Sequence, residues 1–276
     1  MTSTFVCMAL LVLTAWLFVR TARSHGVRNQ KASLADWAEH VYDVAGKHTQ
    51  VTGLLAGFNI TVIILFAARV FELTPSDEDL IPVQIVTSMF MTTYFGYVVT
   101  GFLYSLVIER PGVHRYALFS VASCLYYFSV TVSFTALLPL VQLLHFESLE
   151  IIVLVMVMTS IVGGYQALII PHHDLLLIRR RVLLLLFLAS IPLASLLHRG
   201  FVLLAGPDPT ITLLRVVLPA SCLAVASIFG TCMVSFLWRR LSTPESLVVL
   251  TLVSTLVSTS LCLFLPFEFI RLWFRS

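Results

Sequence analysis

The stretch VTGLLAGFNITVIILFAARVF, residues 51–71, decides the fold class of this 276-residue chain. It carries a single charged side chain, Arg69, close to its end. A helix needs about 20 mainly apolar residues to cross a hydrocarbon core about 30 Å thick. The stretch therefore predicts a transmembrane helix.

The composition extends this prediction to the rest of the chain. Apolar residues make up 59% and charged residues 11%, whereas soluble domains have roughly 45–50% and 25%. So few charges cannot give a soluble protein of this length a polar surface. We expect an all-α integral membrane protein, and we exclude a disordered chain, a secreted disulfide scaffold and a DNA-binding domain.

Seven further segments have the length and apolar content of a span. Together they predict a bundle of about eight transmembrane helices, which forms a single domain over residues 1–276. The first segment is interpreted as an anchor rather than a signal peptide, because no basic residue precedes it. The predicted spans are Phe5–Val19, Val51–Phe71, Ile81–Ile108, Tyr116–Leu144, Leu149–Ile170, Val182–Ala205, Ile211–Trp238 and Ser246–Trp273.

The distribution of the 17 lysines and arginines predicts the orientation of the chain. If the N-terminus lies outside, 12 of them fall in inside loops and 5 at the outer side, as the positive-inside rule requires. The acidic stretch Asp77–Asp79 then lies outside. We therefore expect both termini outside, in a bacterial inner (cytoplasmic) membrane.

The only long loop, residues 20–50, begins basic and then shows helical spacing of apolar residues. Leu34, Trp37, Val41 and Val44 recur on one face, after an N-cap-like Ser33. We expect a short amphipathic helix in this inner-face loop. It lies either on the inner membrane face or against the loops of the bundle.

Residues 53–61 contain the features of the second span that are most open to interpretation. Gly53 and Gly57 form a GxxxG pair beside Ala56, and small residues at this spacing let helices approach closely in lipid. These three residues are the predicted helix-packing site, within the chain or with a second copy or another membrane protein. Asn59 needs a polar partner at this depth, on a neighbouring helix or along a polar path.

The segment from Lys47 to Ile108 resembles helices of the Orai calcium-channel family. In that family a basic stretch leads into a Leu-Leu-small-Gly-Phe helix, an acidic outer loop follows, and the next helix has paired threonines, like Thr92 and Thr93 here. The resemblance implies a channel. The position of the family's selectivity glutamate is occupied here by Leu65, so calcium selectivity is not implied. The segment also resembles uncharacterised bacterial multi-pass membrane proteins.

Hydroxyl and amide side chains form stripes in the third and last spans. Such a stripe is typical either of a pore lining or of a close interface whose hydroxyls bond their own helix. The predicted pore-lining residues are Asn59, Thr61, Gln84, Thr92, Thr255 and Ser258.

Two polar clusters lie between the fifth and sixth spans. His172, His173 and Asp174 are the metal-ligand candidates, although adjacent residues on a helix point about 100° apart. Arg179, Arg180 and Arg181 are expected to contact anionic lipid at the inner boundary.

Three function classes follow from these features. A channel or transporter-like bundle for an ion or small solute is placed first, and a non-catalytic scaffold or sensor that assembles with a partner second. A membrane-embedded lipid enzyme is a distant third, because no nucleophile, acid–base pair or histidine box is evident. No catalytic residue and no cofactor is assigned, and no nucleic-acid partner is expected.

Overall fold

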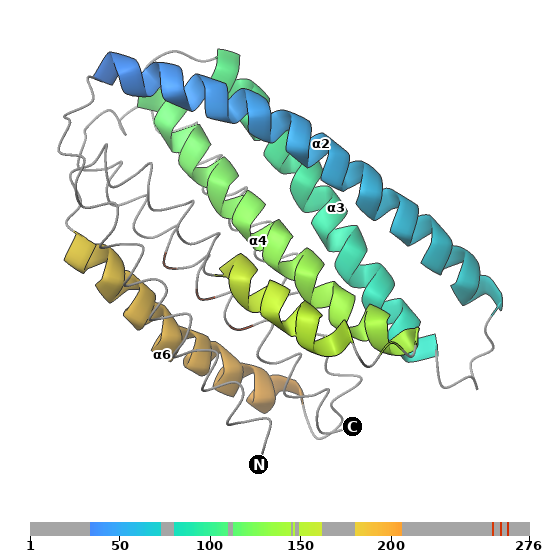
Figure 1. Cartoon of the computed structure of the whole chain (residues 1–276). Coiled ribbons are helices and arrows are strands. Elements are labelled where there is room, and N and C mark those ends of the chain that lie inside the picture. Colours follow the sequence, from blue (N-terminus) through green and yellow to red (C-terminus); the bar gives the residue numbers. More distant parts are fainter. Residues whose placement is uncertain are drawn as a thin grey trace.

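The computed structural model describes residues 34–72, 80–109, 113–144, 146, 149–161 and 180–205, with the single residues Leu256, Ser260 and Phe264. Within these residues every regular element is an α-helix (Figure 1). The described part of the chain therefore has the predicted all-α fold class. The first and seventh predicted spans and most of the eighth lie outside it, so the number of about eight helices stays a prediction.

Three helices are long and apolar enough to cross a membrane. They are α2 (Leu34–Glu72), α3 (Leu80–Glu109) and α4 (Val113–Leu143), and their candidate spans are Val41–Ala68, Val83–Glu109 and Val121–Val141. α3 exceeds its predicted range by one residue at each end. These three helices indicate a membrane-embedded protein.

α2 is longer than the sequence predicts. Residues 34–50, expected to form a short separate helix, continue without a break into the second span. Val41 and Ala45 are fully buried against α3 and α4. These two residues pack on helices, and both predicted alternatives for the segment as a whole, on the inner membrane face or against the loops of the bundle, stay predictions. The 39 residues of α2 make a helix of about 58 Å, well beyond the thickness of the hydrocarbon core.

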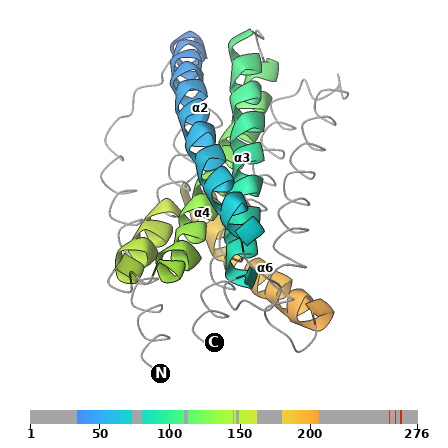
Figure 2. The same cartoon turned by 90° about the vertical axis from the view of Figure 1, so that its right-hand side faces the viewer.

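α3 lies between α2 and α4 and packs against both, whereas α2 and α4 barely touch each other. The three helices follow one another as antiparallel neighbours (Figures 1 and 2). One apolar cluster joins Val62, Phe90 and Phe128 of the three helices. A second cluster joins the first turns of α2 to the end of α3 and the start of α4.

Polar bonds join α4 to its neighbours. The Arg115 guanidinium donates through Nε to the Val107 carbonyl oxygen over 3.0 Å, which holds the start of α4 against the end of α3. Near the middle of α4, the Tyr127 hydroxyl donates over 2.6 Å to the carbonyl oxygen of Ile161, a residue of the helical segment Leu149–Ile161. This bond ties that segment to α4.

α6 (Arg180–Ala205) packs on the same unit through Phe187 and Ala194. It corresponds to the sixth predicted span, Val182–Ala205. Figure 2 shows it steeply inclined to α2 and α3. Phe264, from the last predicted span, is buried in the cluster that contains Phe90 and Phe128. Segments distant in the sequence therefore share one core.

The distribution of polarity suits a lipid environment. Large apolar side chains such as Leu54 (76% exposed) and Ile151 (73% exposed) point outward, while Thr93, Thr100 and Thr131 are buried. The buried threonines satisfy their hydroxyls within their own helix, as Thr100 does by donating to the Gly96 carbonyl over 2.6 Å. The interior can therefore be polar in composition without leaving these donors unpaired.

Two glycines of α3 permit its close approach to the neighbouring helices. A Cβ atom at Gly96 would overlap the side chain of Ser129 in α4, and one at Gly101 would lie 3.1 Å from Oγ1 of Thr52 in α2. Close backbone approach at small residues is the usual way in which helices pack in lipid.

Candidate functional site

The predicted pore-lining residues do not share one path in the described structure. Asn59 is buried between helices, whereas Thr61 is exposed on the outer face of α2 and donates to the Gly57 carbonyl over 3.0 Å. Gln84 and Thr92 are half-buried in α3, and Thr92 donates to the Ser88 carbonyl over 2.9 Å. Thr255 and Ser258 lie outside the described residues. The Thr92 and Thr93 hydroxyls of α3 bond carbonyls of their own helix, and the pore-lining assignment stays a prediction.

Asn59 has the polar partner on a neighbouring helix that the sequence requires. Its Nδ2 donates over 2.6 Å to Oγ1 of Thr93, and the Thr93 hydroxyl donates in turn over 2.9 Å to the Phe90 carbonyl. Both side chains are only 1% exposed. This chain of bonds joins α2 to α3 deep in the spans.

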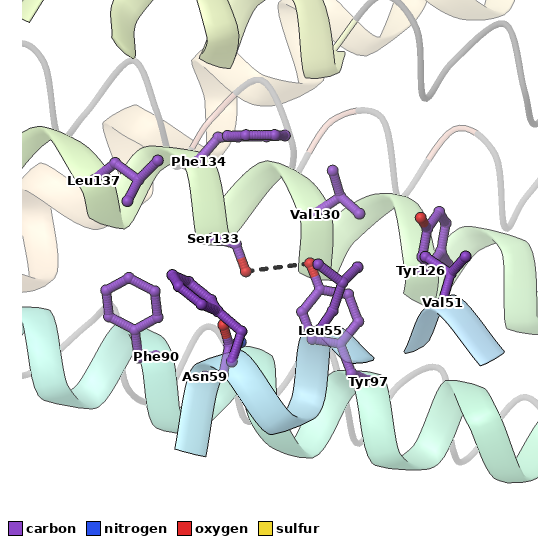
Figure 3. Close-up of a pocket in the computed structure, with 11 residues that line it drawn as sticks. Val51, Leu55, Asn59, Phe90, Tyr97, Tyr126, Val130, Ser133, Phe134 and Leu137 are labelled. Atoms are coloured by element: carbon purple, nitrogen blue, oxygen red, sulfur yellow. Dashed lines mark hydrogen bonds between the residues drawn. The ribbon is translucent and has the colours of Figure 1, made fainter. Parts of the chain in front are cut away.

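A pocket of about 460 Å³ lies beside Asn59, where α2 and α4 diverge. Residues of α2, α3 and α4 line it (Figure 3). It is near the middle of all three candidate spans. The residues that line it are Val51, Leu55, Phe58, Asn59, Phe90, Tyr97, Tyr126, Val130, Ser133, Phe134 and Leu137.

The pocket is aromatic and uncharged. Five rings, from Phe58, Phe90, Tyr97, Tyr126 and Phe134, contribute to its wall. None of the described lining residues carries a formal charge. The polar groups are the Asn59 amide and three hydroxyls, and the Tyr97 and Ser133 hydroxyl oxygens lie 3.2 Å apart in a hydrogen bond across the α3–α4 contact (Figure 3).

His48 lies one helical turn from the pocket on α2. Its ring packs at 5.0 Å from the ring of Tyr126 and 5.1 Å from that of Tyr104. Its Nδ1 is buried and has no hydrogen-bond partner among the described residues. Tyr126 therefore both lines the pocket and contacts this imidazole.

The predicted helix-packing residues separate into two groups. Ala56 is buried, whereas Gly53 and Gly57 are exposed. A Cβ atom at either glycine would meet no other atom within 4 Å among the described residues. The glycine pair thus faces away from α3 and α4.

The remaining candidates add nothing to this site. His172, His173, Asp174 and Arg179 lie outside the described residues, and Arg180 and Arg181 are described only as the first residues of α6. Among the described residues, no group of three metal-ligating side chains comes together. The metal and lipid assignments stay predictions.

Sequence reasoning missed Tyr97, Tyr126 and Ser133. A weak signal was available, because Tyr126 and Ser133 are seven residues apart and so share one helical face of the fourth span. Comparison of the chain with protein-family models, with curated proteins and with solved structures finds no match.

Proposed function

We propose that this protein is a transporter-like helical bundle that binds a small uncharged solute between α2 and α4. The observation that carries the proposal is the pocket of about 460 Å³ beside Asn59. Its volume falls within the roughly 300–1,000 Å³ of ligand pockets, and its wall is almost wholly apolar, as the walls of such pockets predominantly are. Its position near the middle of three spans is the position of substrate sites in many transporters.

The same pocket favours a solute over an ion. An ion that leaves water needs charged groups or a ring of oxygen ligands to replace its hydration shell. The described lining residues offer one amide and three hydroxyls, two of which bond each other. The ion-channel form of the proposal, which the resemblance of residues 47–108 suggested, has less support than the solute form.

The proposal is tested with purified protein reconstituted into vesicles. The vesicles are loaded with a mixture of uncharged solutes that cross lipid slowly, such as polyols, sugars and 4-nitrophenyl glucoside, and with potassium ions. Retained solutes are quantified by mass spectrometry and potassium by a selective electrode. We expect at least one uncharged solute to leave faster than from protein-free vesicles, and potassium to stay at background.

A pocket-filling variant provides the control. Val130→Trp places an indole in the wall of the pocket, whereas Leu65→Trp places it on the exposed face of α2. We expect solute efflux to fall to background in the first variant and to persist in the second. No accelerated efflux of any uncharged solute, or equal efflux from both variants, contradicts the proposal.

A specific observation favours the scaffold or sensor as the second candidate. Gly53 and Gly57 present an open, close-approach surface on α2, with no described neighbour. A second copy of the chain or another membrane protein packs there in this alternative. If labelled protomers still associate in a variant that has lost solute flux, that result supports the scaffold or sensor over the transporter.

The bacterial inner membrane and the orientation with both termini outside belong to the proposal as well. The orientation rests on the distribution of lysines and arginines, and the bacterial membrane rests on the resemblance of residues 47–108 to bacterial multi-pass proteins. Reporter domains fused in turn to residue 1 and to residue 276 test the orientation, and both are expected to report the outer side.

A further inference from the structure

We propose that the helical segment Leu149–Ile161 is a movable arm, which opens and closes as α4 bends at Pro139. The structure shows the closed position, in which the Tyr127 hydroxyl bonds the Ile161 carbonyl oxygen and acts as a latch. The proposal goes beyond the proposed function and does not depend on it, because the movement is measured without any transport.

α4 and the arm form a helical hairpin with a short, bonded link. The Phe146 N–H donates to the Val141 carbonyl oxygen over 2.9 Å, and the Leu149 N–H donates to that of Phe146 over 2.8 Å. The arm runs back beside the second half of α4 (Figures 1 and 2). Its Val153 and Val157 share an apolar cluster with Val141 of α4. Any movement of the last turn of α4 therefore carries the arm with it.

The backbone of α4 is weakened along one side just before this last turn. Pro139 lies inside the helix. It has no N–H to donate to the Thr135 carbonyl oxygen, and its ring crowds that carbonyl. The Thr131 and Thr135 hydroxyls each donate to the carbonyl four residues earlier, over 3.0 and 2.7 Å, a pattern that often bends helices. These residues are four apart and so share one side of α4. A bend therefore costs less here than elsewhere in α4.

The two sides of this bend are held differently. Before it, α4 is fixed to α3, because Gly96 lies in close contact with Ser129 and the Tyr97 and Ser133 hydroxyls bond each other. Beyond it, the arm is held by less. Among the described residues, one side-chain hydrogen bond joins the arm to α2, α3 or α4, and this is the Tyr127 bond of 2.6 Å. The structure thus combines a fixed half of α4 with a lightly held arm.

In lipid the Tyr127 bond is the directional tie of the arm. Phe134, Leu137 and Leu138 of α4 are half-buried against the cluster that contains the arm. Lipid tails can replace such apolar contacts, since they are as apolar as the side chains themselves. The Tyr127 hydroxyl loses this acceptor when the arm moves away, and lipid tails offer none in its place. The bond therefore sets how often the arm is open.

The arm also supports part of the pocket. Phe134 and Leu137 pack against the cluster that contains the arm, and the same two residues line the pocket. Opening of the arm removes neighbours from behind this stretch of the wall. The bend in α4 is therefore placed where it can change the shape of the pocket.

Spin labels on exposed sites measure the movement. One label is placed at Ile151 in the arm and one at Phe102 in α3, both of which are exposed. The labels are attached to a non-natural amino acid, so that the five native cysteines stay unlabelled. Double electron–electron resonance in lipid nanodiscs gives the distribution of distances between the labels. We expect one main distance and a second, less populated one from the open arm. A control pair at Phe102 and Leu65 joins α3 to α2 and should give a single distance.

Three variants separate the hinge from the latch. Pro139→Ala supplies the missing N–H at the bend and should remove the second distance. Tyr127→Phe removes only the hydroxyl and should raise the population of the second distance about three-fold, which corresponds to an average hydrogen bond between membrane helices. Tyr42→Phe makes the same change at an exposed site of α2 and should leave the distribution as it is.

Several outcomes overturn the proposal. A single distance in both the unchanged protein and Tyr127→Phe excludes a movable arm. A second distance that persists in Pro139→Ala excludes the hinge, and a distribution that does not respond to Tyr127→Phe excludes the latch. A second distance in the control pair would mean that the whole bundle loosens. Movement of the arm without flux of any solute refutes the proposed function and leaves this proposal intact, and flux with a fixed arm does the reverse.

Discussion

α3 packs against α2 on one face and against α4 on the other, and the two interfaces differ in how they are fixed. Toward α4, Gly96 lies so close to Ser129 that no Cβ atom fits between them, and two tyrosine–serine hydroxyl pairs flank the contact. Toward α2, a Cβ atom at Gly101 would lie 3.1 Å from Oγ1 of Thr52, which is a tight contact but not an overlap.

The α2 interface has no such glycine overlap among the described residues but contains a shorter side-chain hydrogen bond. Asn59 donates to Thr93 over 2.6 Å, shorter than the 3.2 Å between the Tyr97 and Ser133 oxygens on the other face. Shape thus sets the position of α4, and a polar bond contributes to the position of α2. Asn59, Tyr97 and Ser133 all line the pocket, so the pocket borders side-chain bonds of both interfaces.

The largest effect is expected at Gly96. Gly96→Ala forces Ser129 to move within a buried contact, which should lower the free energy of unfolding by about 1–3 kcal/mol. Unfolding is followed by circular dichroism during titration of mixed micelles with a denaturing detergent. Gly46→Ala, at an open position of α2, is the matched control and should show no loss.

The double variant Gly96→Ala/Ser129→Ala tests the cause of this effect. Removing the Ser129 hydroxyl makes room for the new methyl group, so the double variant should be more stable than Gly96→Ala alone. Losses that simply add would contradict a direct contact between the two positions.

A smaller loss is expected from breaking the bond between α2 and α3. Asn59→Leu keeps a similar volume and removes the donor, while Thr93 still donates to the Phe90 carbonyl. Hydrogen bonds between helices in membranes contribute about 0.6 kcal/mol on average and up to about 1.7, so we expect a loss of about 1 kcal/mol. Thr93→Val should cost a similar amount, and the double variant no more than either. Additive losses would show that the two side chains act independently.

The sequence predicted these interfaces only in part. The ranges of α3 and α4 follow closely from apolar length, because in lipid a helix satisfies all its backbone groups within itself. The start of α2 does not follow, since the continuity of residues 34–50 with the span depends on burial of Val41 and Ala45 against other helices. The sequence showed that a buried Asn59 needs a polar partner, but it did not identify Thr93 as that partner.

The close glycine contacts and the pocket also depend on how several helices pack together, so the sequence did not predict them. Gly53 and Gly57 match the GxxxG pattern and face outward, whereas Gly96 and Gly101 are five apart, match no such pattern and make the close contacts. Tyr126 and Ser133 line the pocket only because α2 diverges from α4, which is a property of three helices together. Spacing within one helix cannot reveal a space between two others.

A third variant compares the two glycine contacts of α3 directly. In Gly101→Ala the new methyl group displaces the Thr52 hydroxyl by a few tenths of an ångström, while alanine favours the helix over glycine by up to about 1 kcal/mol. These effects oppose each other, so we expect the free energy of unfolding to change by less than about 0.5 kcal/mol. A loss as large as that of Gly96→Ala in the same titration would remove the distinction between the two interfaces.

The smallest effect on the fold is expected at Gly57, on the face of α2 that turns away from α3. Because no described atom lies within 4 Å of a Cβ built there, Gly57→Leu should leave the free energy of unfolding unchanged or slightly raised.

The same variant tests whether a second copy of the chain packs on this face. If it does, Gly57→Leu should lower energy transfer between labelled protomers in vesicles to the level of random encounters. The exposed control Leu65→Ala should keep the energy transfer of the unchanged protein. Energy transfer that is unchanged by Gly57→Leu would limit the role of this face to contact with lipid. A marked loss of stability in Gly57→Leu would instead mean that the face is packed within a single protomer, and α2 would then be held on two sides, as α3 is.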